Sequence, residues 1–249
     1  MNTDGIYLHD VSFRYSGAKV HSLSHLTMHI EKGTFLGVTG SNGTGKTTLT
    51  YLFNGLIPHE IDGKLEGEIT IDSEQTSDKS VSYFAKKVGM VFQNPDHMIF
   101  NLTVYEEIEF GLKNLGFVDI EKRIKHALSE VGLIDKIYSD PQNLSFGQKQ
   151  KLCIASALAM DTEYIVLDEP SSMLDYKSSL DLYHLLSVLH KKGKTIIVIE
   201  HDTDFIYTFA DHTLVIQNGS VEKIGKTQEV FADSEKIKTM GIKVPRKIQ

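Results

Sequence analysis

The stretch that decides the fold is Gly40-Ser41-Asn42-Gly43-Thr44-Gly45-Lys46-Thr47-Thr48. Its spacing, G-x-x-x-x-G-K-[ST], is typical of a loop that binds nucleotide phosphates. The glycines let successive backbone N–H groups curl around phosphate oxygens, and a following helix adds its positive N-terminal end. Lys46 supplies a point charge for the β- and γ-phosphates, and the Thr47 hydroxyl can bind Mg²⁺. The sequence therefore predicts a nucleoside-triphosphate site at 40–48.

The residues around this loop have the pattern of alternating strands and helices. A short apolar run at 34–39 precedes the loop, and apolar residues at helical spacing follow it over 49–56. The continuous apolar runs at 164–167 and 195–199 are typical of parallel strands that are buried on both faces. Alternation over 26–30 indicates a half-buried strand ahead of the loop, and Asn218-Gly219 indicates a β-hairpin. The pattern predicts an α/β fold.

The segment at 94–147 has a different period. Thr103 with Glu106 makes a capping-box pattern, and two runs of apolar residues at helical spacing follow it. We expect an all-helical insert here. After about residue 235 the chain is rich in lysine, and we expect a helix fragment and a loose tail over 236–249.

The composition fits a globular protein. The chain has 249 residues, 41% of them hydrophobic, and a formal net charge of −7. These values exclude the disordered and disulfide-rich classes, and the acidic balance argues against sequence-independent DNA binding. No apolar run approaches the ~18 residues that cross a bilayer, and the N-terminus lacks a signal-peptide pattern. Cys153 lies in a helix-like apolar run, so we expect a buried thiol in a reducing, cytosolic compartment.

A second acidic element is Tyr164-Ile165-Val166-Leu167-Asp168-Glu169. A buried strand that ends in two carboxylates places them at the sheet edge where α/β proteins bind ligands. Asp168 can hold Mg²⁺ through its water shell, and Glu169 can accept a proton from an attacking water. Together with the phosphate loop, this element indicates nucleotide hydrolysis.

A third motif indicates which class of nucleotide-hydrolysing protein this is. Leu144-Ser145-Phe146-Gly147-Gln148 ends 20 residues before Asp168 and resembles the L-S-G-G-Q signature of ATP-binding-cassette (ABC) ATPases, with Phe146 at the usual first glycine. The resemblance implies the P-loop NTPase fold of ABC ATPases, with an antiparallel β subdomain and an inserted α-helical subdomain. It implies a single domain over 5–235 with the helical subdomain at about 94–147, followed by a tail at 236–249.

The same resemblance implies a role for each matching residue. The switch histidine matches His201, the adenine-stacking aromatic matches Tyr15, and the D-loop matches Ser172-Met173-Leu174-Asp175. Glu169 and His201 would be catalytic, residues 40–48 with Tyr15 would bind ATP, and Mg²⁺ would be the metal. The implied Mg²⁺ ligands are Thr47, Gln93 and Asp168. The residues that would contact ATP held by a partner subunit are Ser145, Gly147 and Gln148.

Two stretches narrow the resemblance further. Residues 92–96 and 103–114 are similar to the ATPases of energy-coupling-factor (ECF) transporters. That likeness implies an ATP-hydrolysing subunit that powers import of a vitamin or metal ion at the cytoplasmic face of the cell membrane. The implied partners are a second cassette (identical or paralogous), a transmembrane coupling subunit and a separate membrane substrate-binding subunit. Many such ATPases carry a further C-terminal segment, whereas this sequence stops at Gln249.

Three other interpretations compete with this one. A conventional ABC transporter ATPase would share every motif. A soluble ABC ATPase acting on nucleic acid or ribosomes is disfavoured by the single cassette, the absence of cysteine pairs and the acidic charge, so no nucleic-acid partner is expected. A cassette that only binds ATP is disfavoured because Lys46, Asp168, Glu169 and His201 are all present. The spacing of His21, His25 and His29 could suggest a metal site, but a solvated strand face is favoured.

Overall fold

The computed structural model describes residues 4–248, and its larger sheet has six strands in the order β10-β9-β3-β8-β7-β6. All neighbouring strands in it are parallel except β10, which pairs antiparallel with β9. The strands are β3 (Phe35–Thr39), β6 (Val88–Val91), β7 (Tyr164–Asp168), β8 (Thr195–Ile199), β9 (His212–Gln217) and β10 (Ser220–Lys226). The buried parallel strands predicted at 164–167 and 195–199 are confirmed. The predicted hairpin is also confirmed, because Asn218 and Gly219 form its turn with φ of 50° and 76°.

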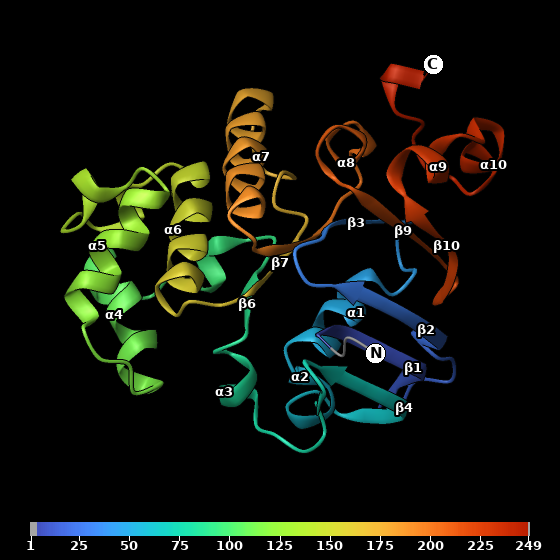
Figure 1. The fold of residues 1–249 in the computed structure, drawn as a ribbon, viewed down its shortest axis with the longest axis horizontal. Coiled ribbons are helices and arrows are strands. Elements are labelled where there is room, and N and C mark those ends of the chain that lie inside the picture. Colours follow the sequence, from blue (N-terminus) through green and yellow to red (C-terminus); the bar gives the residue numbers. More distant parts are fainter. Residues whose placement is uncertain (1–3, 249) are drawn as a thin grey trace.

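A second, antiparallel sheet has the order β2-β1-β4-β5. Its strands are β1 (Gly5–Tyr15), β2 (Leu23–Glu31), β4 (Gly63–Ile71) and β5 (Glu74–Gln75). The alternation that predicts a half-buried strand is confirmed, since Leu26, Met28 and Ile30 are buried. In Figure 1 this sheet lies at the opposite end of the molecule from α4 (Val104–Asn114) and α5 (Ile120–Glu130).

The six-stranded sheet separates two apolar layers. Alternate side chains of one strand pack on opposite faces, as Ile165 and Val166 do. One layer joins the sheet to α1 (Lys46–Phe53) and to the antiparallel sheet. The other joins it to the helices of the insert, to α6 (Phe146–Ala159) and to α7 (Tyr176–Lys191). This burial fixes the carboxyl ends of β3, β6, β7 and β8 at one edge, where the predicted site residues follow the strands.

The helix predicted after the phosphate loop is α1, and the two predicted in the insert are α4 and α5. The described residues form several further helices. They are α2 (Leu56–His59), α3 (Val81–Phe84), α6 (Phe146–Ala159), α7 (Tyr176–Lys191), α8 (Thr203–Phe209), α9 (Thr227–Phe231), α10 (Ser234–Thr239) and the 3₁₀ turns at Pro95–His97, Ile134–Lys136, Pro141–Asn143 and Arg246–Ile248. Thr103 caps α4, although the Glu106 carboxylate accepts a bond from the Thr103 hydroxyl and not from its backbone N–H. Cys153 is buried in α6, and this burial raises the pKa of its thiol to about 12. None of the helices within residues 4–248 is long and apolar enough to cross a membrane.

The C-terminal residues differ from the expected loose tail. Ile237, Met240, Ile242 and Val244 are buried in a cluster that includes Val215 of β9. The lysines that dominate this stretch of sequence obscure these apolar side chains, which recur every two or three residues. Burial of four such side chains holds the segment against the domain.

Candidate active site

The phosphate loop connects β3 to α1 and is tightly packed. Gly45 has φ of 95°, and a Cβ at this position would lie 2.4 Å from the carbonyl oxygen of Ser22. A Cβ at Gly40 would lie 2.2 Å from the carbonyl oxygen of Ile216. Such distances exclude any side chain, so the two framing glycines of the motif are also required by the packing of the loop.

Lys46 points back into this loop. Its ammonium donates hydrogen bonds to the carbonyl oxygens of Gly40 and Ser41, both at 2.9 Å. The side chain is only 5% exposed. Burial lowers the pKa of Lys46, while the charges of Glu169 and Asp168 act in the opposite direction. The positive charge therefore lies inside the loop and within electrostatic reach of both acidic residues that follow β7.

Asp168 is the buried carboxylate of the site. It ends β7, is 6% exposed, and has its pKa raised by that burial, while a hydrogen bond from the Thr47 hydroxyl acts against the rise. Its Oδ1 atom has no hydrogen-bond partner among residues 4–248. A buried carboxylate oxygen normally has a partner, and Mg²⁺ binds carboxylate and hydroxyl oxygens. The two side chains thus fit the predicted Mg²⁺.

Glu169 is the centre of a small polar cluster. Its Oε1 lies 3.0 Å from Nε2 of His201, and its Oε2 accepts a bond from Nε2 of Gln93 at 3.2 Å. Gln93 Nε2 also lies 3.3 Å from the Ser172 hydroxyl, which donates to the Glu169 carbonyl oxygen at 2.9 Å. The structure therefore brings together three predicted residues that follow β6, β7 and β8. The sequence places Ser172 in the motif that ends at Asp175 but gives no sign of its contacts with Gln93 and Glu169.

Tyr15 lies beside the start of α1. Its hydroxyl is 2.9 Å from Oγ1 of Thr48, and its ring meets Phe13 edge-on with centroids 4.9 Å apart. It lines a hollow of about 420 Å³ together with Arg14, the 16–17 turn and residues 62–64. The Tyr15 ring therefore lines a hollow beside α1, the helix that follows the phosphate loop.

The predicted signature residues are not joined to the phosphate loop. Ser145 caps α6, and its side chain and that of Gln148 form a complete capping box with each other's backbone N–H groups. A Cβ at Gly147 would meet nothing closer than Leu174, at 3.5 Å. Asp175 caps α7, and the backbone N–H of Ser178 at 2.7 Å lowers the pKa of its carboxyl. Within residues 4–248 no hydrogen bond or ion pair connects 145–148 to 40–48.

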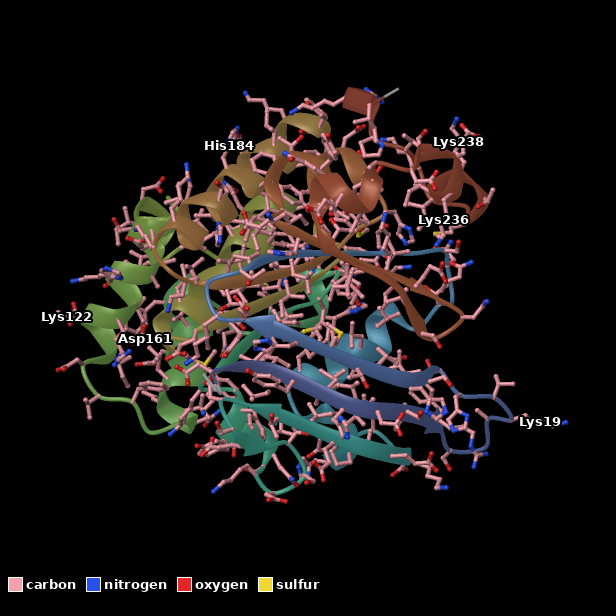
Figure 2. The ribbon with its side chains drawn as sticks, turned by 45° about the vertical axis from the view of Figure 1, so that its right-hand side comes forward. Lys19, Lys122, Asp161, His184, Lys236 and Lys238 are labelled. Atoms are coloured by element: carbon pink, nitrogen blue, oxygen red, sulfur yellow. The ribbon has the colours of Figure 1, made fainter. Side chains whose placement is uncertain are left out.

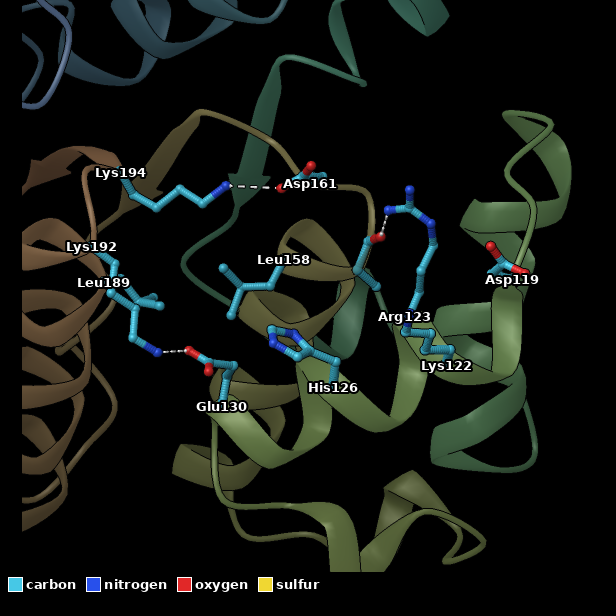
Figure 3. Close-up of a pocket in the computed structure, with 11 residues that line it drawn as sticks. Asp119, Lys122, Arg123, His126, Glu130, Leu158, Asp161, Leu189, Lys192 and Lys194 are labelled. Atoms are coloured by element: carbon cyan, nitrogen blue, oxygen red, sulfur yellow. Dashed lines mark hydrogen bonds and ion pairs between the residues drawn. The ribbon is translucent and has the colours of Figure 1, made fainter.

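A cavity of about 500 Å³ lies elsewhere, between α5 and the ends of α6 and α7 (Figure 3). Three of the basic side chains that line it have partners. Lys192 pairs with Glu130, Lys194 lies 3.4 Å from Asp161, and Arg123 donates to a backbone carbonyl oxygen. None of the predicted site residues lines it. The cluster around Glu169 and the phosphate loop therefore stays the candidate active site.

Comparison with known proteins gives the family. The pattern of the ABC transporter family matches residues 23–172. A putative ABC transporter ATP-binding protein of Pyrococcus horikoshii is 44% identical over 98% of this chain and 87% of that protein. The energy-coupling factor transporter ATP-binding protein EcfA of Methanocaldococcus jannaschii is 40% identical over 95% of this chain and 84% of that protein.

Two solved structures share the fold. CbiO1 of Clostridium perfringens, described as part of the ABC transporter complex CbiONQ, has a TM-score of 0.82 and 32% identity over 97% of this chain and 96% of that one. A dimeric ATP-binding cassette in a post-hydrolysis state, bound to ADP and Pi, has a TM-score of 0.76 and 28% identity over 89% of this chain and 98% of that one. The chain belongs to the ABC transporter family, as an ATPase subunit of the cassette fold.

Proposed function

We propose that this chain is the ATPase of an ECF-type importer, lies peripherally at the cytoplasmic face of the membrane, and acts as one half of a head-to-tail cassette dimer. The cluster of Gln93, Glu169 and His201 around one carboxylate is the observation that carries the hydrolytic role. The names of the EcfA relative and of CbiO1 support the transporter class. A conventional ABC importer or exporter is the alternative.

In the proposed reaction the phosphate loop holds ATP and Glu169 removes a proton from water. Backbone N–H groups of 40–45 and the Lys46 ammonium bind the phosphates, and Tyr15 faces the adenine. The water oxygen attacks the γ-phosphorus while the bond to the β–γ bridging oxygen breaks, which yields ADP and inorganic phosphate. His201 and Gln93 orient the carboxylate. Mg²⁺, held by Thr47, Gln93 and Asp168, would neutralise phosphate charge.

In the proposed dimer, the signature residues of one chain add contacts to the γ-phosphate that the other chain's phosphate loop holds. The N-terminus of α6 (14 residues long) is a favourable end for an anion, and Ser145, Gly147 and Gln148 lie at it. In a head-to-tail arrangement these residues would face ATP in the partner's phosphate loop. The dimeric form of the related cassette supports this arrangement.

Replacing Gly147 by aspartate tests this contact. A Cβ at Gly147 would make only ordinary van der Waals contacts, so the domain should fold normally, but the carboxylate would repel the partner's γ-phosphate. We expect ATP turnover to fall by about a hundredfold, with little change in ATP affinity of the single chain. Gly225→Asp is the control, because a Cβ there also has room, with its nearest neighbour at 4.0 Å. Normal turnover of the Gly147 variant would contradict the head-to-tail dimer.

An exposed apolar surface is available for a membrane subunit. Phe100 and Leu102, which follow the Gln93 loop, are 64% and 80% exposed, and Phe100 packs edge-on against Phe110 at 4.9 Å. An exposed group of apolar side chains is typical of a protein contact. We propose that this surface, which follows Gln93 by only a few residues in the chain, receives the transmembrane coupling subunit.

Co-purification from native membranes tests the proposed function. The tagged protein is extracted in mild detergent and the bound proteins are identified. A transmembrane coupling protein together with a small substrate-binding membrane protein would support the ECF class, and the small protein would point to the vitamin or metal ion. Two conventional permease subunits would support the alternative. Recovery with ribosomes or nucleic acid, without any membrane protein, would contradict transport.

The same experiment tests the docking surface. We expect Leu102→Ser to reduce recovery of the membrane subunit by about tenfold, because it removes the most exposed apolar side chain of this surface. Val118→Ser is the matched control, since Val118 is 73% exposed on the same helical insert but outside this surface. Equal loss in both variants would argue against a specific contact at Leu102.

A further inference from the structure

The C-terminal strap, which we define as residues 234–248, is held in place by apolar burial. Ile237, Met240, Ile242 and Val244 are between 1% and 9% exposed. They pack in one cluster with side chains of α8, β9 and α9. Because the burial of several apolar side chains stabilises this packing, the strap does not depend on its surface charges to stay in place.

The strap contacts the phosphate loop directly. The Ser41 hydroxyl donates a hydrogen bond to the carbonyl oxygen of Met240 at 2.8 Å. Residues 241–243 line one side of a pocket of about 250 Å³, and residues 39–42 and His201 line the rest. The strap therefore forms a wall of the space between the phosphate loop and His201.

The strap also holds the three residues that follow His201. The Lys243 ammonium lies 2.7 Å from a carboxylate oxygen of Asp202 and 2.7 Å from one of Asp204. The Thr203 hydroxyl donates to the Lys243 carbonyl oxygen at 2.8 Å, and the backbone N–H of Arg246 donates to Asp204 at 2.6 Å. The Oδ1 atom of Asp202 that meets Lys243 also caps α8. Four contacts thus fix the backbone that immediately follows His201.

We propose that Lys243 is a positioning residue for ATP hydrolysis: by binding Asp202 and Asp204 it holds His201 against Glu169. The inference rests on the proposed function, in which His201 and Glu169 act on ATP. The Ser41 contact places the same strap against the phosphate loop, so the strap links the loop that holds ATP to the segment that carries His201.

Other lysines of the strap lack this geometry and provide a control. Lys238 pairs with Glu235 on its own helix at 2.7 Å, and Lys236 pairs with Glu222 at 3.0 Å. Figure 2 shows Lys236 and Lys238 at the outer surface of the C-terminal helices. Exposed ion pairs contribute little to stability, so loss of either charge should leave the fold and the site unchanged.

The test is the ATPase activity of the full chain with Lys243→Met, which keeps most of the aliphatic stem and removes the charge. We expect kcat to fall by about tenfold, because a small displacement of a site residue has a large effect on rate, while KM changes by less than about twofold. Lys243→Arg should restore most of the activity, and Lys238→Met should match the wild type. Thermal unfolding should give the same midpoint for all of them within a few degrees.

The outcomes separate this inference from the proposed function. Wild-type kcat in Lys243→Met would overturn the inference. The effect must act through His201, so Lys243→Met should lower kcat little further when His201 is already replaced by alanine. A loss of kcat in the His201→Ala background as large as in the wild type would also overturn the inference. If Lys243→Met unfolds, Asp204→Asn tests the same link, because it removes the carboxylate charge that pairs with the Lys243 ammonium, and unchanged kcat there would also overturn it. Failure of the proposed function would be seen instead as normal turnover in Glu169→Gln.

Discussion

Replacing Glu169 by glutamine will lower ATP turnover by about a thousandfold while ATP still binds. Loss of a general base typically costs 10²- to 10⁴-fold in rate. The amide has the shape of the carboxylate and can still bond to Gln93 and His201, but it cannot take the proton of the attacking water. The phosphate contacts of Lys46 and the loop are unaffected. Single-turnover kinetics and equilibrium ATP binding measure the two effects separately.

Glu163→Gln is the matched control for this variant. Glu163 directly precedes the same strand, β7, where it pairs with Lys32 at 2.5 Å, far along the strand from the phosphate loop. We expect its turnover to equal that of the wild type. Turnover in Glu169→Gln above about a tenth of the wild-type rate would remove Glu169 from the role of base.

The candidate active-site cluster was predictable because its members are tied to sequence patterns. Gln93, Glu169 and His201 each come within two residues of the end of an apolar run, and parallel strands place their carboxyl ends at one edge of the sheet. The glycine-rich loop needs backbone shapes that few residues other than glycine adopt, so its composition predicts its conformation. At strand ends and in the phosphate loop, the local sequence is therefore enough to predict the local structure.

Contacts between distant segments were not predictable. Ser41 and Met240 are 199 residues apart, and no period or motif links them. The strap was therefore expected to be loose. The contacts of the histidines in β2 were also not predictable from sequence. His25 is exposed, as expected, but His29 stacks on Tyr7 with ring centroids 3.8 Å apart. The stacking depends on the register of β1 against β2, which pairs these two residues.

Replacing Lys46 by methionine will weaken ATP binding by about a hundredfold. Methionine retains most of the stem, but it removes the buried charge that meets the phosphates and that interacts with the acidic Asp168 and Glu169. Charge-assisted bonds of this kind contribute about 1.5–3 kcal/mol each, or roughly one to two powers of ten in affinity. Lys19→Met, at the outer tip of the β1–β2 loop (Figure 2), is the control.

We expect the Lys46 and Glu169 variants to have opposite effects on assembly, and this contrast tests the proposed dimer most directly. If two chains join head-to-tail around ATP, Glu169→Gln should accumulate as a dimer in MgATP because the nucleotide is not consumed. Lys46→Met should remain a single chain at the same ATP concentration, because it does not hold the nucleotide that fills the interface. Light scattering with and without MgATP distinguishes the two states. A Glu169→Gln chain that binds ATP yet stays monomeric would show that 145–148 do not complete the site of a second identical chain.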